Sequence, residues 1–293
     1  MEKNQIVICE DRGLISVSGQ DAKDFLQNIL SNDVAKVNSV KSLFSGIFTP
    51  QGKYNYEFFI VKSQDGYFLD CDGEFTSEIV NHLLKFKLRS RIFIKNLTSK
   101  FIVGAINYEK FKEIQISEKK NTETIWYRDS YLFLDPRTKK LGARIISNLE
   151  KLHLTIKKLN LKIVNNKSYL NQAHSYGIPI KGIKKLQNQL FGLEANFDEF
   201  NAIDFKKGCY VGQENTARMK LKNKIRKKLL PIKSDDKLDV GTSLIFNDKI
   251  IGKVLIGEDY PFALIKLYDP DFSEFKNKEI FAEKKKIKII NRF

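Results

Sequence analysis

The stretch FKKGCYVGQENTAR, residues 205–218, is the most informative part of this chain of 293 residues. It places one thiol, Cys209, after two lysines, Lys206 and Lys207, and between two glycines. A cysteine acts as a nucleophile or a metal ligand in its thiolate form, which nearby positive charge stabilises. The sequence therefore predicts a functional thiol at Cys209, with Lys207 stabilising the thiolate.

The residues around Cys209 predict a shaped loop. Gly208 and Gly212 would let the backbone adopt a positive φ and approach a ligand closely. Gln213 and Glu214 add an amide and a carboxylate that could orient the loop or hold a polar heterocycle. The alternative is that Cys209 is a small buried hydrophobe and that the glycines only form a turn.

The sequence KGCYVGQE, followed by Ala217 and Arg218, resembles the signature of the YgfZ family of folate-binding proteins. Further blocks follow in the family's order: GQDA at 19–22, FLQ at 25–27, NDV at 32–34, TPQGK at 49–53, DPR at 135–137, LG at 141–142 and GIP at 177–179. The family is related to the glycine-cleavage T-protein, an aminomethyltransferase, and acts in making or repairing iron–sulfur proteins. The resemblance implies a T-protein-like folate-binding body with a small C-terminal β-barrel.

The resemblance also implies a site for tetrahydrofolate or a derivative. Position in the family pattern places Arg12 and Tyr169 where aromatic residues that contact folate are expected. Tyr169 keeps the aromatic character, and the guanidinium plane of Arg12 could still stack on a ring. In T-protein-like sequences a glutamate commonly stands where this chain has Ser175. Alternatively, Tyr169 fills the core and Arg12 is a surface charge.

The three cysteines are odd in number and widely spaced, at Cys9, Cys71 and Cys209, which indicates a reducing compartment and no disulfide framework. We therefore expect a cytoplasmic protein. No CxxC pair is present and the three histidines are dispersed, so we expect no metal site. No apolar run reaches the roughly 18 residues that span a bilayer, so we expect no membrane segment.

A net charge of +16 favours binding to a polyanion. Most of the excess lies in short lysine runs that are typical of solvated surfaces. One cluster differs, because six basic residues between 220 and 228 directly follow the cysteine motif. This cluster could hold a polyglutamate tail, RNA or an acidic partner.

Two groups of charged residues are each open to two interpretations. Asp70 and Asp72 flank Cys71 and could act as an acid and base pair, or mark the end of a strand. Asp135 and Arg137 could face a ligand cavity, or pair with each other to fix a turn. We favour the structural interpretation for both.

Apolar periodicity predicts a mixture of helices and strands. Helices are expected at 21–30, capped by Asp21, at 75–88 and at 149–159, and strands at 14–17, 54–61, 66–70, 101–105 and 131–134. Around Pro231 the pattern changes to short strands at 229–232, 243–246, 250–256 and 262–267, which are typical of a small barrel. We expect an α+β fold with a T-protein-like region at 1–230, formed by two interleaved subdomains, and a β-barrel at 231–293.

The predicted function is that of a folate-binding accessory protein for assembly or repair of iron–sulfur clusters in client enzymes, including tRNA-modifying enzymes. Its partners would be folate and iron–sulfur client or assembly proteins. The alternatives are a tetrahydrofolate-dependent aminomethyltransferase and a basic RNA-binding module. Motifs for dinucleotides, nucleoside triphosphates and common hydrolases are absent from the sequence, which does not favour a classical enzyme. The predicted site residues are Cys209 and Lys207 for the chemistry, Lys206, Gly208, Tyr210, Gly212, Gln213, Glu214 and Arg218 for the loop, and Tyr169 and Arg12 for folate.

Overall fold

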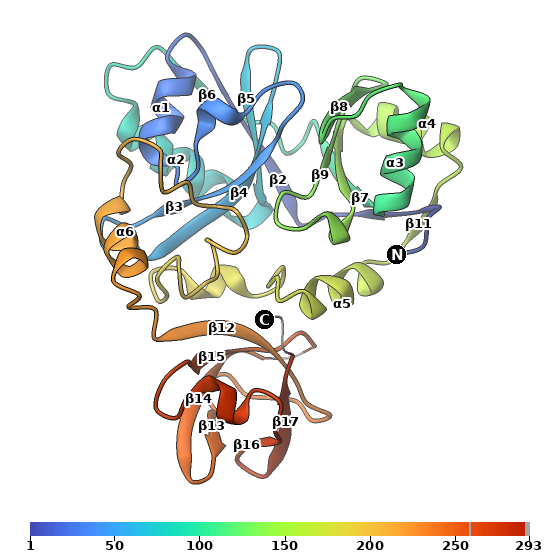
Figure 1. The fold of residues 1–293 in the computed structure, drawn as a ribbon. Coiled ribbons are helices and arrows are strands. Elements are labelled where there is room, and N and C mark those ends of the chain that lie inside the picture. Colours follow the sequence, from blue (N-terminus) through green and yellow to red (C-terminus); the bar gives the residue numbers. More distant parts are fainter. Residues whose placement is uncertain (258, 291–293) are drawn as a thin grey trace. The chain divides into compact units, whose positions relative to one another are not determined.

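The computed structural model describes residues 1–257 and 259–290, so residues 258 and 291–293 of the predicted barrel domain lie outside it. The chain forms two compact units, each built from separate segments (Figure 1). Unit 1 comprises Met1–Phe48, Asn55–Asn166 and Asp198–Val211, and unit 2 comprises Thr49–Tyr54, Lys167–Phe197 and Gly212–Phe293. The cysteine motif is divided between the units, since Val211 ends a segment of unit 1 and Gly212 begins one of unit 2.

The first sheet of unit 1 has five strands in the order β3-β4-β5-β2-β6. The strands are β2 (Arg12–Ser18), β3 (Leu43–Phe48), β4 (Tyr54–Lys62), β5 (Gly66–Asp72) and β6 (Phe93–Asn96). Alternate side chains along a strand point to opposite faces. One face, with Phe58 and Leu69, packs in a common core with helices α1 (Ala22–Ile29) and α2 (Thr76–Lys87).

Helix α1 begins directly after Asp21, as predicted, but the carboxylate of Asp21 does not cap it. The Asp21 carboxylate instead accepts a hydrogen bond of 2.7 Å from the backbone N–H of Arg91, in the segment that leads into β6. This bond lowers the pKa of Asp21. Asp21 therefore links the start of α1 to a distant loop, because the fold brings the backbone N–H of Arg91 to its carboxylate.

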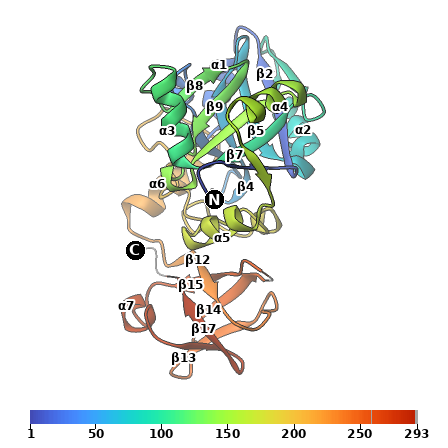
Figure 2. The same cartoon turned by 90° about the vertical axis from the view of Figure 1, so that its right-hand side faces the viewer.

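The second sheet of unit 1 has six strands in the order β11-β1-β7-β10-β9-β8. The strands are β1 (Gln5–Ile8), β7 (Ile102–Ile106), β8 (Thr124–Tyr127), β9 (Ser130–Leu134), β10 (Ala143–Ser147) and β11 (Lys162–Val164). Only the β1–β11 pair is parallel. Helices α3 (Tyr108–Ser117) and α4 (Leu149–Lys158) cover this sheet and contribute Phe111 and Leu152 to its core (Figures 1 and 2).

Unit 2 contains α5 (Lys167–Ser175), α6 (Gln213–Leu221) and a closed barrel of order β12-β15-β14-β13-β16-β17. The barrel strands are β12 (Lys227–Lys233), β13 (Ser243–Phe246), β14 (Lys249–Ile256), β15 (Phe262–Lys266), β16 (Ile280–Ala282) and β17 (Lys285–Ile289). Strand β12 closes the barrel because it pairs with β15 through residues 227–231 and with β17 through residues 232–233. The short helix α7 (Phe272–Phe275) lies beside the barrel (Figure 2).

The predicted α+β class and C-terminal barrel are confirmed. Four barrel strands were expected, and β16 and β17 complete the closure. The boundary at 230/231 falls within β12, and the predicted division into 1–230 and 231–293 stays a prediction. Among the described residues, no group of three or more His, Cys, Asp or Glu side chains could hold a metal ion. In the same part of the chain, no helix is long and apolar enough to cross a membrane.

Candidate functional site

The segment before the thiol is fixed to unit 1 by Lys207. Its side chain is buried, with 8% exposed, and its ammonium donates to the carbonyl oxygens of Gln27 at 2.6 Å, Asn32 at 3.1 Å and Leu30. These carbonyls belong to the end of α1 and the turn that follows it. The ammonium also lies 5.0 Å from the ring centroid of Tyr210, within the range of a cation–π contact. Lys207 therefore anchors the motif segment to α1.

Burial lowers the pKa of Lys207 to about 8, and the nearby carboxylates Asp33 and Asp204 oppose this shift. At neutral pH the side chain therefore remains mostly protonated and keeps its three hydrogen bonds. Its contacts favour an anchoring role. The predicted stabilisation of the Cys209 thiolate by Lys207 stays a prediction.

Cys209 itself is exposed and is not in a disulfide. The alternative of a small buried hydrophobe is therefore wrong. The neighbouring residue Gly208 has open space around it, because an added Cβ would meet no described atom within 4 Å apart from those of its immediate chain neighbours. Tyr210, on the other side, is buried and its ring lies 6.4 Å from that of Phe48. An accessible thiol thus lies between two anchored residues, Lys207 and Tyr210.

The two glycines of the motif differ. Gly212 has a φ of +84° and precedes α6, so the prediction of a positive φ is confirmed there. Gly208 does not have a positive φ. Because it has no side chain, it leaves open space beside Cys209. At Gly212 the chain turns into the helix that carries the rest of the motif.

Helix α6 presents the charged end of the motif. Arg218 donates to the Glu214 carboxylate at 2.8 Å, one helical turn away, and both side chains are exposed. Such a pair contributes only a few tenths of a kcal/mol, about 0.3–0.5, to helix stability. On the buried side, the Thr216 hydroxyl donates to the Gly212 carbonyl at 2.8 Å. The Glu214 and Arg218 side chains are therefore oriented by each other.

The residues predicted to contact folate lie in different units. Tyr169, on α5 of unit 2, is buried with 3% of its surface exposed. Ser175, at the end of the same helix, donates its hydroxyl to the Gln172 carbonyl at 2.8 Å and supplies no carboxylate. Arg12 lies in unit 1.

Arg12 belongs to a buried ion cluster on the face of the five-stranded sheet opposite the helices. Its Nε lies 2.7 Å from Asp70 Oδ1, and its NH2 donates to the Asp70 backbone carbonyl at 2.7 Å. Arg144 on β10 contacts the other carboxylate oxygen of Asp70, with its Nε at 2.9 Å and its NH2 at 2.8 Å. Asp70 thus joins the two sheets of unit 1. The alternative of a surface charge at Arg12 is wrong.

Asp135 and Arg137 form a second buried pair, as the structural interpretation predicted. The Arg137 guanidinium binds both carboxylate oxygens of Asp135, at 3.0 and 2.7 Å. The guanidinium carbons of Arg137 and Arg144 lie 4.7 and 4.4 Å from the centroid of Phe59, and that of Arg12 lies 5.7 Å from it. Three arginines and one aromatic ring therefore form a polar cluster within unit 1.

Glu57 is a residue of this cluster that the sequence analysis missed. It lies on β4, two residues before Phe59, and hence on the same face of the sheet. Burial raises its pKa to about 7, against the effect of Arg137 and Arg12, while Asp72 and Asp135 reinforce the rise. The signal was available, because Glu57 is the one acidic residue in the otherwise apolar or neutral strand YNYEFFIV. A carboxyl group that titrates near neutrality can accept or donate a proton.

The likeness to known proteins is clear from the fold. No protein-family model matches the chain. The structure resembles the glycine cleavage system aminomethyltransferase T from Bartonella henselae with a TM-score of 0.76 and 12% sequence identity, over 98% of this chain and 86% of that one. The chain therefore has the fold of a T-protein-type aminomethyltransferase. At 12% identity the likeness concerns the fold alone.

Sequence comparison identifies the family. The chain is 30% identical over 236 residues to the mitochondrial iron–sulfur cluster assembly factor IBA57 homolog of Mycosarcoma maydis, covering 75% of this chain and 55% of that protein. It is 26% identical over 277 residues to the homolog of Dictyostelium discoideum, with 85% and 67% covered. It is 24% identical over 271 residues to human IBA57, with 85% and 73% covered. The chain spans about half the length of the first of these relatives. It belongs to the IBA57/YgfZ family, which confirms the predicted resemblance.

Proposed function

We propose that this protein is a folate-binding accessory factor for the assembly or repair of iron–sulfur clusters in client enzymes, tRNA-modifying enzymes among them. The observation that carries the proposal is the exposed thiol of Cys209 within the segment KGCYVGQE. The named relatives support the assembly part, because each is called an iron–sulfur cluster assembly factor.

The local geometry supports a chemical role for the thiol. Lys207 and Tyr210 hold the chain on either side of Cys209, and Gly208 leaves the approach open. A thiol that only filled the core would be buried, as Cys71 is. In this proposal Cys209 forms a transient bond to iron, to a sulfur species or to a one-carbon adduct.

Replacement of Cys209 by alanine tests the assembly role. The readout is the activity of iron–sulfur enzymes in cells that depend on this chain. We expect Cys209→Ala to lose this activity while its unfolding midpoint stays unchanged, since the side chain is exposed. Cys9→Ala is the matched control and should keep the activity. Full activity of Cys209→Ala would overturn the proposal.

Folate binding is the second part of the proposal, and the T-protein-type fold and the buried aromatic ring of Tyr169 support it. The test is a calorimetric titration with tetrahydrofolate. Tyr169→Phe keeps the ring and removes only the hydroxyl, so it separates a polar contact from simple packing. Saturable binding that the substitution weakens is the expected result. Absence of binding would mean that the site does not function without a carboxylate at Ser175.

The fold also favours one alternative, a tetrahydrofolate-dependent aminomethyltransferase. Such an enzyme would transfer a methylene group from a carrier-bound amine to tetrahydrofolate. Turnover with the carrier protein would establish it, and tetrahydrofolate binding without turnover favours the accessory role.

Polyanion binding is a further proposed property of the chain. Five exposed basic residues run from the last turn of α6 to the first residue of β12: Lys220, Lys222, Lys224, Arg226 and Lys227. RNA affinity that falls steeply with salt, and falls further when these charges are removed, would support it. A cytoplasmic location stays a prediction, and the relatives named above are described as mitochondrial.

A further inference from the structure

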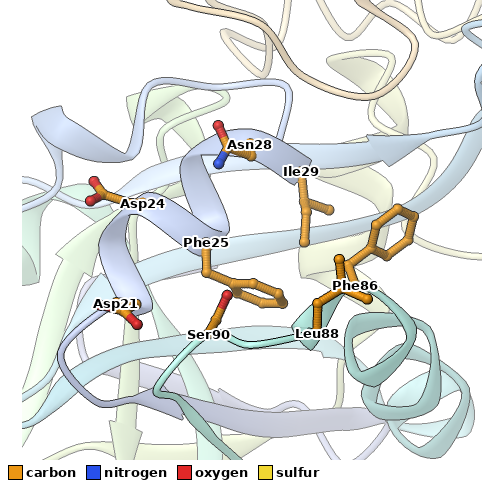
Figure 3. A pocket seen from close by; sticks show the side chains of 8 residues that line it. All are labelled: Asp21, Asp24, Phe25, Asn28, Ile29, Phe86, Leu88 and Ser90. Atoms are coloured by element: carbon orange, nitrogen blue, oxygen red, sulfur yellow. The ribbon is translucent and has the colours of Figure 1, made fainter.

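A surface pocket lies between α1 and the segment that follows α2, within unit 1 (Figure 3). Its volume is about 360 Å³. From α1, the buried side chains of Phe25 and Ile29 form an apolar floor. From the other side, Phe86, Leu88 and Ser90 complete the wall. None of these residues belongs to the cysteine motif or to the arginine cluster.

Two large apolar side chains at this pocket are exposed. Phe86 continues the row of Ile79 and Leu83 along α2, which are buried, yet 37% of Phe86 is exposed. Leu88 is 88% exposed. A contiguous apolar patch of this kind is typical of a surface that binds another molecule.

The backbone at Leu88 is unusual as well. Leu88 is the C-cap of α2 and has a φ of +41°, in a region that a leucine rarely adopts. Its ψ of −115° lies outside the left-handed helical region, and glycine is the residue that adopts such a conformation without a steric cost. Neither packing nor capping explains a leucine here, because its side chain is almost wholly in solvent. Residues held in rare conformations often cluster at binding sites.

The pocket has acidic side chains at one end. Figure 3 shows Asp21 and Asp24 at the end opposite Phe86. The eight lining residues include these two carboxylates and neither lysine nor arginine, in a chain whose net charge is +16. Lys85, Lys87 and Arg89 are close in sequence but do not line the pocket. Arg91 pairs with Asp21, its Nε 3.5 Å from the carboxylate, which leaves Asp24 as the carboxylate offered to a ligand's cation. A ligand that fits would carry bulky apolar groups with a cation at one end.

We propose that this pocket docks an amphipathic helix of a partner protein, whose apolar side chains pack on Phe25, Ile29 and Leu88 and whose lysine or arginine pairs with Asp24. Helices that bind grooves in this way anchor apolar residues one helical turn apart. The charge complementarity selects a basic amphipathic helix over an acidic one. This surface is separate from the proposed thiol chemistry, so either can fail without the other.

The test uses the full chain and two synthetic helical peptides with the same leucine pattern. Lysines flank the leucines in one peptide, and glutamates flank them in the other. We expect the basic peptide to shift the amide signals of α1 and of residues 86–90 in a nuclear magnetic resonance titration, and the acidic peptide to bind at least about tenfold more weakly.

Two variants and one control locate the contact. Leu88→Asn removes the apolar contact and should weaken the basic peptide about tenfold or more. Asp24→Asn should weaken the basic peptide and leave the acidic one unchanged. Leu149→Asn, at another exposed leucine in unit 1, should change neither affinity.

The proposal is overturned if neither peptide binds, if both bind equally, or if Leu88→Asn has no more effect than Leu149→Asn. Sedimentation of the free chain tests whether a second copy of the chain occupies the patch instead. A concentration-dependent dimer that Leu88→Asn abolishes would assign the patch to a second copy and overturn the proposal of a partner helix.

Discussion

Lys207→Met is the most informative test of how the motif segment is held. Methionine has a similar length and no hydrogen-bond donor, so the carbonyls of Gln27, Leu30 and Asn32 lose the ammonium. Each hydrogen bond to a charged group contributes about 1.5–3 kcal/mol. Burial of the ammonium opposes this gain, because it lowers the pKa from 10.5 to about 8, and each pKa unit corresponds to about 1.4 kcal/mol. We expect a net loss of about 3 kcal/mol in the free energy of unfolding.

The assay is denaturant unfolding at pH 7, with Lys206→Met as the matched control. Lys206 is the preceding residue and is exposed, so its substitution should change the free energy by less than about 0.5 kcal/mol. Equal stability of the two variants would refute the anchoring role. The rate of alkylation of Cys209 tests the alternative that Lys207 stabilises the Cys209 thiolate. A large fall in this rate in folded Lys207→Met protein, with no loss of stability, would mean that the lysine activates the thiol instead.

Three further predictions concern other parts of the structure. Arg144→Met leaves the fully buried carboxylate of Asp70 with one partner fewer and should cost about 3–5 kcal/mol of unfolding free energy, measured by denaturant titration. Glu57 has a folded-state pKa raised from 4.5 to about 7, so its contribution to stability is complete below pH 4.5 and is lost as pH rises through about 7. Glu57→Gln should therefore flatten this fall between pH 5 and 8, and an unchanged pH profile would contradict the assignment. Gly212→Ala should cost about 1 kcal/mol or more because of the positive φ, whereas Gly208→Ala should be nearly neutral in thermal unfolding.

Regular elements were predictable because their signals are local. Apolar residues at helical spacing located α1 and α2, and runs of β-favouring residues located β4 and β5, to within about two residues. The strands β13 and β14 were found in the same way. The strands β16 and β17 were missed, since β16 is only three residues long and three of the five residues of β17 are lysines.

Part of the candidate site could also be predicted. The segment KGCYVGQE marked Cys209, and the structure places this thiol in solvent. It also marked Gly212, whose positive φ follows from the turn into α6. A motif states which residue types a site needs, but it does not state which other segments meet them. The roles of Lys207 and Glu57 were therefore beyond its reach.

The sequence by itself determined the family, the α+β class, the barrel and the position of the thiol, because these depend on residue types at fixed spacing. Only the tertiary structure decided where charged groups find their partners. Lys207 meets a carbonyl 180 residues away, and Asp70 joins Arg12 to Arg144, 74 residues beyond it. The carboxylate of Asp21 binds Arg91 and not the start of its own helix. Burial and hydrogen bonding depend on which distant segments become neighbours, and local sequence carries no such information.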